Sequence, residues 1–154
     1  MFKKILVCLD GSKLAEQITP YAIDMAMAHK AKIVLFRVLP LPVAMAPGAP
    51  GMPIESPMTP EVEAEAKDYL LGIATPLADE GVSTEVVVEQ GSSAGKGIVD
   101  YANKNSVDLI AIATHGRSGL GRAVFGSVAD YVLRQSGRPI LLITPKDITV
   151  GGNR

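Results

Sequence analysis

The chain has 154 residues and a formal net charge of −1, with no tryptophan and 5% aromatic residues. Near neutrality and few aromatic rings argue against a nucleic-acid-binding surface. No apolar run approaches the roughly 18 residues needed to cross a bilayer, and the start is too short for a secretory signal, so we expect a cytoplasmic protein. Cys8 is the only cysteine. The sequence therefore excludes an intrachain disulfide and predicts a small buried side chain at this position.

The first half of the chain predicts two strands around a helix. Lys3–Leu9 is an apolar strand that ends at Asp10-Gly11-Ser12, and Ser12 can cap a helix that Pro20 should kink. Lys32–Val38 is the second strand. Residues 39–60 contain seven prolines and two glycines, and we expect a loop there because proline lacks a backbone donor and disrupts helices.

The second half continues the alternation of helices and strands. The predicted elements are a helix from Pro60 to about Glu80, a strand over Val82–Glu89, a helix from about Gly97 to Asn103, a strand over Val107–Ala113, a helix over Val128–Gln135 and a strand over Ile140–Thr144. This order predicts an α/β fold, a doubly wound five-stranded parallel sheet with helices on both faces. We expect one domain over 1–146, followed by a tail over 147–154. Ligands of such sheets bind beyond the carboxyl ends of the strands, where the strand order reverses.

One glycine-rich loop predicts an anion-binding site. After the apolar strand Val107–Ala113, residues 116–126 contain four glycines together with Arg117 and Arg122, and Gly126-Ser127 opens a helix. A helix start offers free backbone N–H groups and a positive dipole, which suit a phosphate. The alternative is that the glycines only turn the chain and the arginines are only solvated.

The segment ATHGRSGLGRAVFGSV resembles the nucleotide loop of the universal stress protein (UspA-like) family, whose ATP-binding members carry G-x2-G-x9-G-[ST]. Gly116, nine further residues and Gly126-Ser127 match this pattern, whereas Ala113 replaces its first glycine. The resemblance covers nearly the whole chain, from KKILVCLDGS to the closing strand. It implies the sheet order 3-2-1-4-5, which places Asp10 beside the loop.

The resemblance also implies the roles of individual residues. Asp10 would contact the nucleoside, the backbone of Val38 would read the adenine edge, Gly116, Gly126, Ser127 and Val128 would hold phosphate and ribose, and Ala113 and His115 would line the same loop. We add Arg117 and Arg122 as charge partners of the phosphates. A turn or cap role alone would also explain Asp10 before Gly11.

The leading hypothesis is an adenine-nucleotide-binding stress-response or regulatory module, with ATP (or AMP or ADP) hydrolysed slowly or not at all. Mg²⁺ would accompany the phosphates without a protein metal site, and we assign no catalytic residue. Relatives dimerise through the last strand, which implies a homodimer through 138–144. The first alternative is a nucleotide-free dimeric interaction protein of the same family, which Ala113 favours.

The remote alternative is a small serine hydrolase. Gly91–Gly95 formally fits the G-x-S-x-G pattern, with Ser93 as nucleophile and Asp100 or Asp108 with His115 as partners. The close spacing of Ser93 and His115 and the lack of an HGGG-like segment argue against it.

Overall fold

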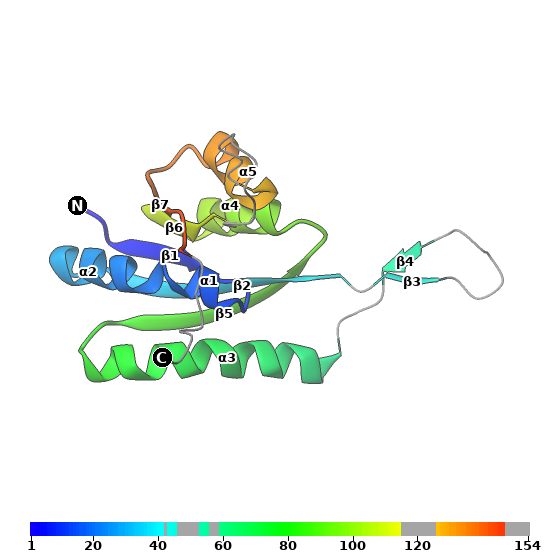
Figure 1. Ribbon diagram of the computed structural model, residues 1–154, viewed down its shortest axis with the longest axis horizontal. Coiled ribbons are helices and arrows are strands. Elements are labelled where there is room, and N and C mark those ends of the chain that lie inside the picture. The colour runs from blue at the N-terminus through cyan, green and yellow to red at the C-terminus, as the bar shows by residue number, and fades with distance from the viewer. Residues whose placement is uncertain (42, 46–52, 56–58, 115–125, 147–154) are drawn as a thin grey trace, which may run out of the picture.

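Five parallel strands form the centre of the protein. The computed structural model describes residues 1–41, 43–45, 53–55, 59–114 and 126–146. The strands are β1 (Lys4–Cys8), β2 (Lys32–Pro40), β5 (Thr84–Gly91), β6 (Leu109–Ala113) and β7 (Ile140–Ile143), in the order β5-β2-β1-β6-β7 (Figure 1). All four neighbouring pairs are parallel. When only the five strands of this sheet are numbered along the chain, the order is 3-2-1-4-5. This confirms the predicted order.

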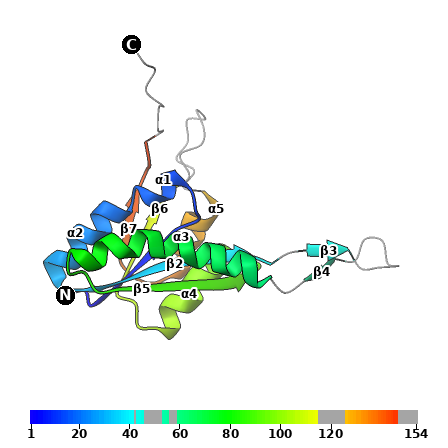
Figure 2. The ribbon, with the colours of Figure 1, turned by 90° about the horizontal axis from the view of Figure 1, so that it is seen from below.

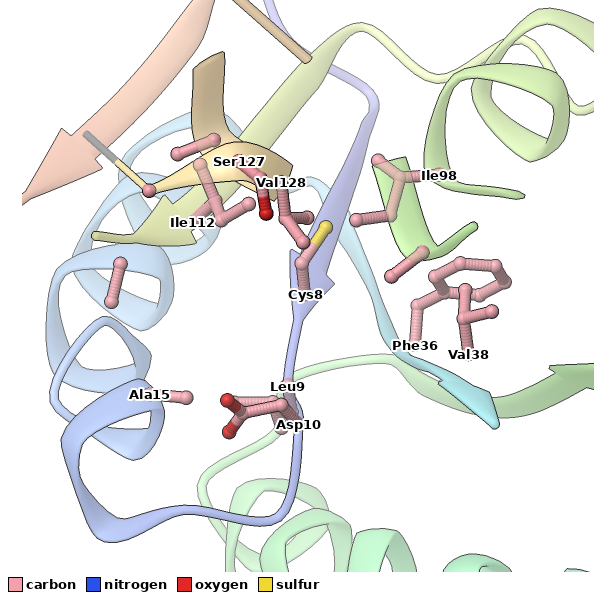
Figure 3. A pocket seen from close by; sticks show the side chains of 14 residues that line it. Cys8, Leu9, Asp10, Ala15, Phe36, Val38, Ile98, Ile112, Ser127 and Val128 are labelled. Atoms are coloured by element: carbon pink, nitrogen blue, oxygen red, sulfur yellow. The ribbon is translucent and has the colours of Figure 1, made fainter. Parts of the chain in front are cut away.

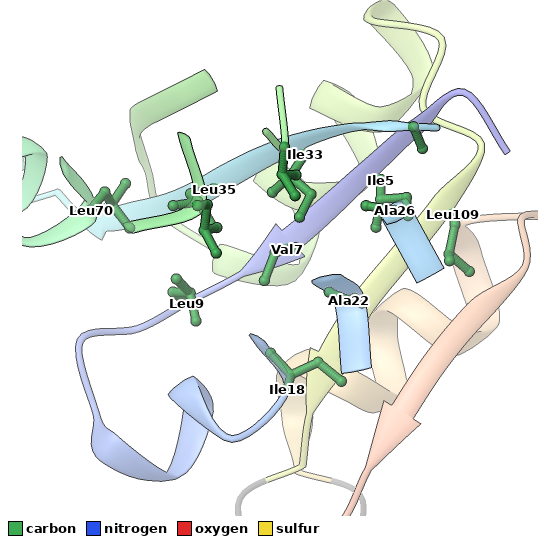
Figure 4. Packing of buried hydrophobic residues seen from close by; sticks show 14 of the residues in the cluster. Ile5, Val7, Leu9, Ile18, Ala22, Ala26, Ile33, Leu35, Leu70 and Leu109 are labelled. Carbon is green, nitrogen blue, oxygen red and sulfur yellow. The ribbon is translucent and has the colours of Figure 1, made fainter. Parts of the chain in front are cut away.

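Helices cover both faces of the sheet, as predicted. The helices α1 (Lys13–Glu16), α2 (Thr19–His29) and α3 (Pro60–Asp79) lie on one face, and α4 (Ala94–Lys104) and α5 (Ser127–Gln135) lie on the other (Figures 1 and 2). The side chains of β1 alternate between these layers: Ile5 and Val7 pack towards α2 (Figure 4), whereas Leu6 packs in the cluster that includes residues of α4. Because both faces are covered, the central strands β1 and β6 are nearly continuous apolar runs.

Proline separates the first two helices. The sequence predicts one helix with a kink at Pro20, but α1 ends at Glu16 and α2 begins at Thr19. Pro20 lies in the first turn of α2, where its missing N–H would have no acceptor within the helix. The prediction of one kinked helix is therefore wrong, because proline starts a new helix here.

The segment 39–60 contains more regular structure than the prediction of a loop. Strand β2 continues to Pro40, and β3 (Val43–Met45) pairs with β4 (Pro53–Glu55) in a two-stranded antiparallel sheet away from the main sheet (Figure 1). Proline is compatible with the first position of a strand, as at Pro53. The prediction of a loop is thus wrong for these strands.

Other element boundaries also differ from prediction by up to three residues. Helix α4 begins at Ala94, three residues before the predicted Gly97, because Ser93 caps it. Strand β5 spans Thr84–Gly91 instead of Val82–Glu89.

Asp108 joins the amino ends of β1 and β6. Its Oδ2 accepts hydrogen bonds from the backbone N–H groups of Lys3 (2.8 Å) and Lys4 (2.9 Å). Both hydrogen bonds lower the pKa of Asp108 because they stabilise the charged carboxylate, and the bond from Lys3 has the larger effect.

We expect Asp108→Ala to lower the free energy of unfolding by roughly 1–3 kcal/mol at pH 7, because it removes two hydrogen bonds to a charged acceptor. The lowered pKa in the folded state means that this stabilisation is fully present above the unfolded value of about 3.9 and is lost as the pH falls through the folded value. Urea unfolding from pH 7 to pH 3 measures the difference. Asp24→Ala, at an exposed position of α2, is the control. A difference that stays constant down to pH 3 would contradict the assignment.

Candidate functional site

A pocket of about 370 Å³ opens at the carboxyl ends of β1 and β6, where the strand order reverses (Figure 3). This is the position at which ligands bind in sheets of this kind, and the volume is in the range of small-molecule sites. The lining residues are Cys8, Leu9, Asp10, Ala15, Phe36, Val38, Ala94, Ile98, Ile112, Ala113, Gly126, Ser127, Val128 and Ala129. Most of these side chains are apolar, so the pocket suits a ligand with a flat or apolar portion.

The amino end of α5 supplies the polar side of the pocket. Gly126 precedes the helix with φ 76° and ψ 153°, a backbone conformation that is essentially restricted to glycine. The N–H of Asp130 donates to the carbonyl of Gly126 (3.0 Å), whereas the N–H groups of Ser127, Val128 and Ala129 have no backbone acceptor among the described residues. Free donors at the positive end of a helix, inside a pocket, suit an anionic group.

Asp10 lies at the rim of the pocket, directly after β1. Its Oδ1 accepts a hydrogen bond from the N–H of Ser12 (2.9 Å), and Gly11 has a φ of 88°. The turn role that the sequence left open for Asp10 is therefore present. The same carboxylate lines the pocket next to Ala15 (Figure 3), where it can accept hydrogen bonds from hydroxyl groups.

Val38 lies in β2, two residues before its end, and Ala113 ends β6, so these residues come from the strands on either side of β1. A Cβ atom added to Gly97 would lie 3.0 Å from Cγ2 of Val38, so α4 approaches β2 closely because residue 97 lacks a side chain. Ala113 is 9% exposed, pairs with Ile143 in β7 and lines the pocket. The methyl group of Ala113 thus belongs to the wall where the family pattern has a glycine.

The sequence did not identify the apolar wall of the pocket. Phe36 and Ile98 come from β2 and α4, and Cys8 lies between the two helices of that face (Figure 3). Cys8 is buried, as predicted, and burial raises the pKa of its thiol, which stays protonated at neutral pH. Apolar periodicity could have marked Ile98 as buried, but not as a residue of a pocket.

Other predicted site residues lie outside the described part of the chain. These are His115, Gly116 and Arg117, together with Arg122. The structure therefore brings together six of the predicted residues around one pocket: Asp10, Val38, Ala113, Gly126, Ser127 and Val128.

The groups proposed for a serine hydrolase are engaged elsewhere. Ser93 caps α4, where its Oγ accepts from the N–H of Lys96 at 3.4 Å. The carboxylate of Asp100 binds Nζ of Lys96, and Asp108 lies at the opposite, amino end of the sheet. Neither carboxylate is placed to orient a base beside Ser93.

The described residues form neither a metal-binding cluster nor a membrane-spanning helix. In the part of the chain that the structure describes, no three His, Cys, Asp or Glu side chains are grouped so that they could hold a metal ion. None of the described helices combines the length and the apolar character that a membrane span requires.

Comparison of the sequence with known proteins gives a consistent result. The model of the universal stress protein family matches residues 1–144. A universal stress protein of Methanocaldococcus jannaschii is 27% identical over 143 residues, which cover 93% of this chain and 82% of that protein. One from Synechocystis sp. is 28% identical over 151 residues, which cover 92% of this chain and 97% of that protein.

Solved structures show the same fold. A universal stress protein in complex with cAMP has a TM-score of 0.68 at 19% identity, covering 94% of this chain and 98% of its own. One from Archaeoglobus fulgidus in complex with dAMP has a TM-score of 0.64 at 23% identity, with coverages of 93% and 98%. One from Arabidopsis thaliana with AMP bound has a TM-score of 0.65 at 14% identity, with coverages of 94% and 92%. The family model, the relatives and the parallel sheet agree, and this chain belongs to the universal stress protein family.

Proposed function

We propose that this protein binds an adenine nucleotide, ATP or its mono- or diphosphate, in the pocket between β1, β6 and α5, and acts as a regulatory module in a stress response. The observation that carries the proposal is that the N–H groups at the start of α5, which have no backbone acceptor among the described residues, lie beside an apolar pocket. Structurally similar members of the family have been solved with cAMP, dAMP and AMP, which supports an adenine nucleotide as the ligand.

In the proposed complex each part of the nucleotide meets a group of matching chemistry. The base enters the apolar part of the pocket near Val38 and Ile98, and the ribose hydroxyls donate to Asp10. The phosphates accept hydrogen bonds from the N–H groups of Ser127 and Val128. His115, Gly116 and Arg117 complete the phosphate site, with Arg122 as a second cation, and Mg²⁺ binds through the phosphates.

Slow or absent hydrolysis fits this proposal. Among the described lining residues, Asp10 is the one carboxylate, and it is also held by the turn at Ser12. Binding and release of the nucleotide are sufficient for a regulatory role. The predicted cytoplasmic location stays a prediction.

The second candidate is a nucleotide-free interaction protein of the same family, and the methyl group of Ala113 in the pocket wall favours it. Calorimetry with ATP, AMP and GTP separates the two functions. We expect ATP and AMP to bind and GTP to bind more weakly. If no nucleotide binds at millimolar concentration, the second candidate replaces the first.

We also propose a homodimer through 138–144. Strand β7 lies at one end of the sheet order, pairs with β6 on one side and has half-buried side chains from Ile140 to Ile143. An exposed edge strand of this kind can pair with a second copy of the chain. Light scattering should give a mass of two chains, and a monomer at all concentrations tested would contradict the proposal.

A further inference from the structure

Arg37 places a guanidinium group beside the pocket. It belongs to β2, directly before Val38, and its side chain lies against the turn that follows β1. A Cβ atom added to Gly11 would lie 2.9 Å from Nη2 and 3.1 Å from Nη1 of Arg37, so the guanidinium occupies the space that a side chain at residue 11 would need. Arg37 is thus close to two residues that line the pocket. Its guanidinium lies against Gly11, which follows Asp10, and Val38 is the next residue in the chain.

The guanidinium of Arg37 contacts the ring of Tyr69. Its Cζ lies 5.3 Å from the ring centroid of Tyr69, a cation–π contact from α3. Within the described residues, Arg37 makes no hydrogen bond and no ion pair. Arginine is charged at any physiological pH and carries five N–H donors. A partly buried guanidinium with its donors unpaired by these residues suits an anion from outside the chain.

The carboxylate of Glu16, which contacts Tyr69, is bound to other groups. Glu16 accepts hydrogen bonds from Nζ of Lys13 (2.9 Å) and from the hydroxyl of Tyr69 (3.1 Å). Burial, followed by the charge of Glu16, raises the pKa of Tyr69, although Arg37 acts in the opposite direction. Tyr69 is therefore a neutral donor at pH 7, and its contact with Arg37 leaves the positive charge unneutralised.

We propose that Arg37 binds a second phosphate, carried on the 2′ or 3′ oxygen of the nucleotide's ribose. This inference rests on the proposed function. With the ribose hydroxyls at Asp10 and the 5′-phosphates at α5, a group on a ribose hydroxyl projects from the side of the sugar that faces the Asp10–Gly11 turn. The guanidinium of Arg37, from β2, lies against that turn. Dinucleotide-binding proteins use one or the other of these groups at the ribose: an acidic residue binds the free 2′-hydroxyl, and a nearby arginine accommodates a 2′-phosphate.

The test compares three ligands on the full chain by calorimetry: 5′-AMP, adenosine 2′,5′-bisphosphate and adenosine 3′,5′-bisphosphate. We expect one bisphosphate to bind about tenfold or more tightly than 5′-AMP, as a charge-assisted bidentate contact predicts. Arg37→Met should remove this difference while the affinity for 5′-AMP changes by less than about twofold, and Arg37→Lys should restore part of it. Arg134→Met removes an exposed positive charge from α5 and is the control. It should keep the difference.

The possible results distinguish a failure of the role assigned to Arg37 from a failure of the proposed nucleotide binding. If 5′-AMP binds and neither bisphosphate binds more tightly, the role of Arg37 is overturned and the proposed function stands. If a bisphosphate binds more tightly but Arg37→Met keeps the difference, another residue holds the second phosphate and the assignment to Arg37 is again overturned. If no nucleotide binds, the proposed function and the inference built on it both fail.

Discussion

Replacement of Gly126 by valine is expected to abolish nucleotide binding while the protein remains folded. Gly126 has φ 76° and ψ 153°, and a β-branched residue in this conformation is strained by about 1–3 kcal/mol. The chain can relieve the strain only by rotating the peptide groups at the start of α5. Such a rotation turns the N–H groups of Ser127 and Val128 away from the pocket, and the proposed phosphate site loses its donors.

Gly81→Val is the matched control for this experiment. Gly81 has a φ of 78°, nothing lies within 4 Å of an added Cβ atom, and the residue follows α3 outside the pocket. We expect both variants to lose similar amounts of stability in thermal unfolding, whereas only Gly126→Val loses binding in calorimetry. Wild-type affinity in Gly126→Val would show that this loop does not hold the phosphates.

A carboxylate at the start of α5 should also prevent binding, without any loss of stability. In Ser127→Asp the negative charge lies at the first position of the helix, where it interacts favourably with the helix dipole. We expect the free energy of unfolding to stay the same or to rise by up to about 1 kcal/mol. The same charge repels the phosphates and competes for their N–H donors, so binding of ATP should fall below detection.

Ser127→Asn separates charge from size. Asparagine has nearly the shape of aspartate but no charge, and the backbone N–H of residue 127 remains available. We therefore expect Ser127→Asn to bind ATP within about tenfold of the wild type, since the proposed donors are backbone groups. Calorimetry measures the affinities, and urea unfolding measures the stabilities. Tight binding of ATP to Ser127→Asp would exclude this helix start as the phosphate site.

Local patterns were sufficient to predict most of the fold. The apolar runs Lys32–Val38 and Val107–Ala113 indicated strands, and both lie within or overlap strands of the parallel sheet. The segment 39–60 shows where this reasoning fails. Its prolines indicate a loop, but β3 and β4 pair with each other, and pairing between segments is not visible in composition.

The candidate site was predicted only in part, because contacts between distant segments of the chain are not visible in local sequence patterns. The pattern Gly126-Ser127 at a helix start identified the donors, because a helix terminus leaves N–H groups free wherever it forms. The roles of Asp10 and Val38 came from a resemblance, and the strand order then placed both around the same pocket. Arg37 was missed, because nothing in its own segment indicates whether its charge is paired.

By itself the sequence determined the alternation of strands and helices and the buried position of Cys8, and it predicted N–H donors for an anion at the start of α5, since each depends on neighbouring residues along the chain. Only the tertiary structure decided that Ile98 and Phe36 form the apolar wall beside these donors, and that Arg37 lies over Tyr69 and against Gly11. These contacts join residues from different strands and helices. Their geometry depends on how closely the layers pack, and that closeness is set by residues such as Gly97, which permits α4 to approach β2.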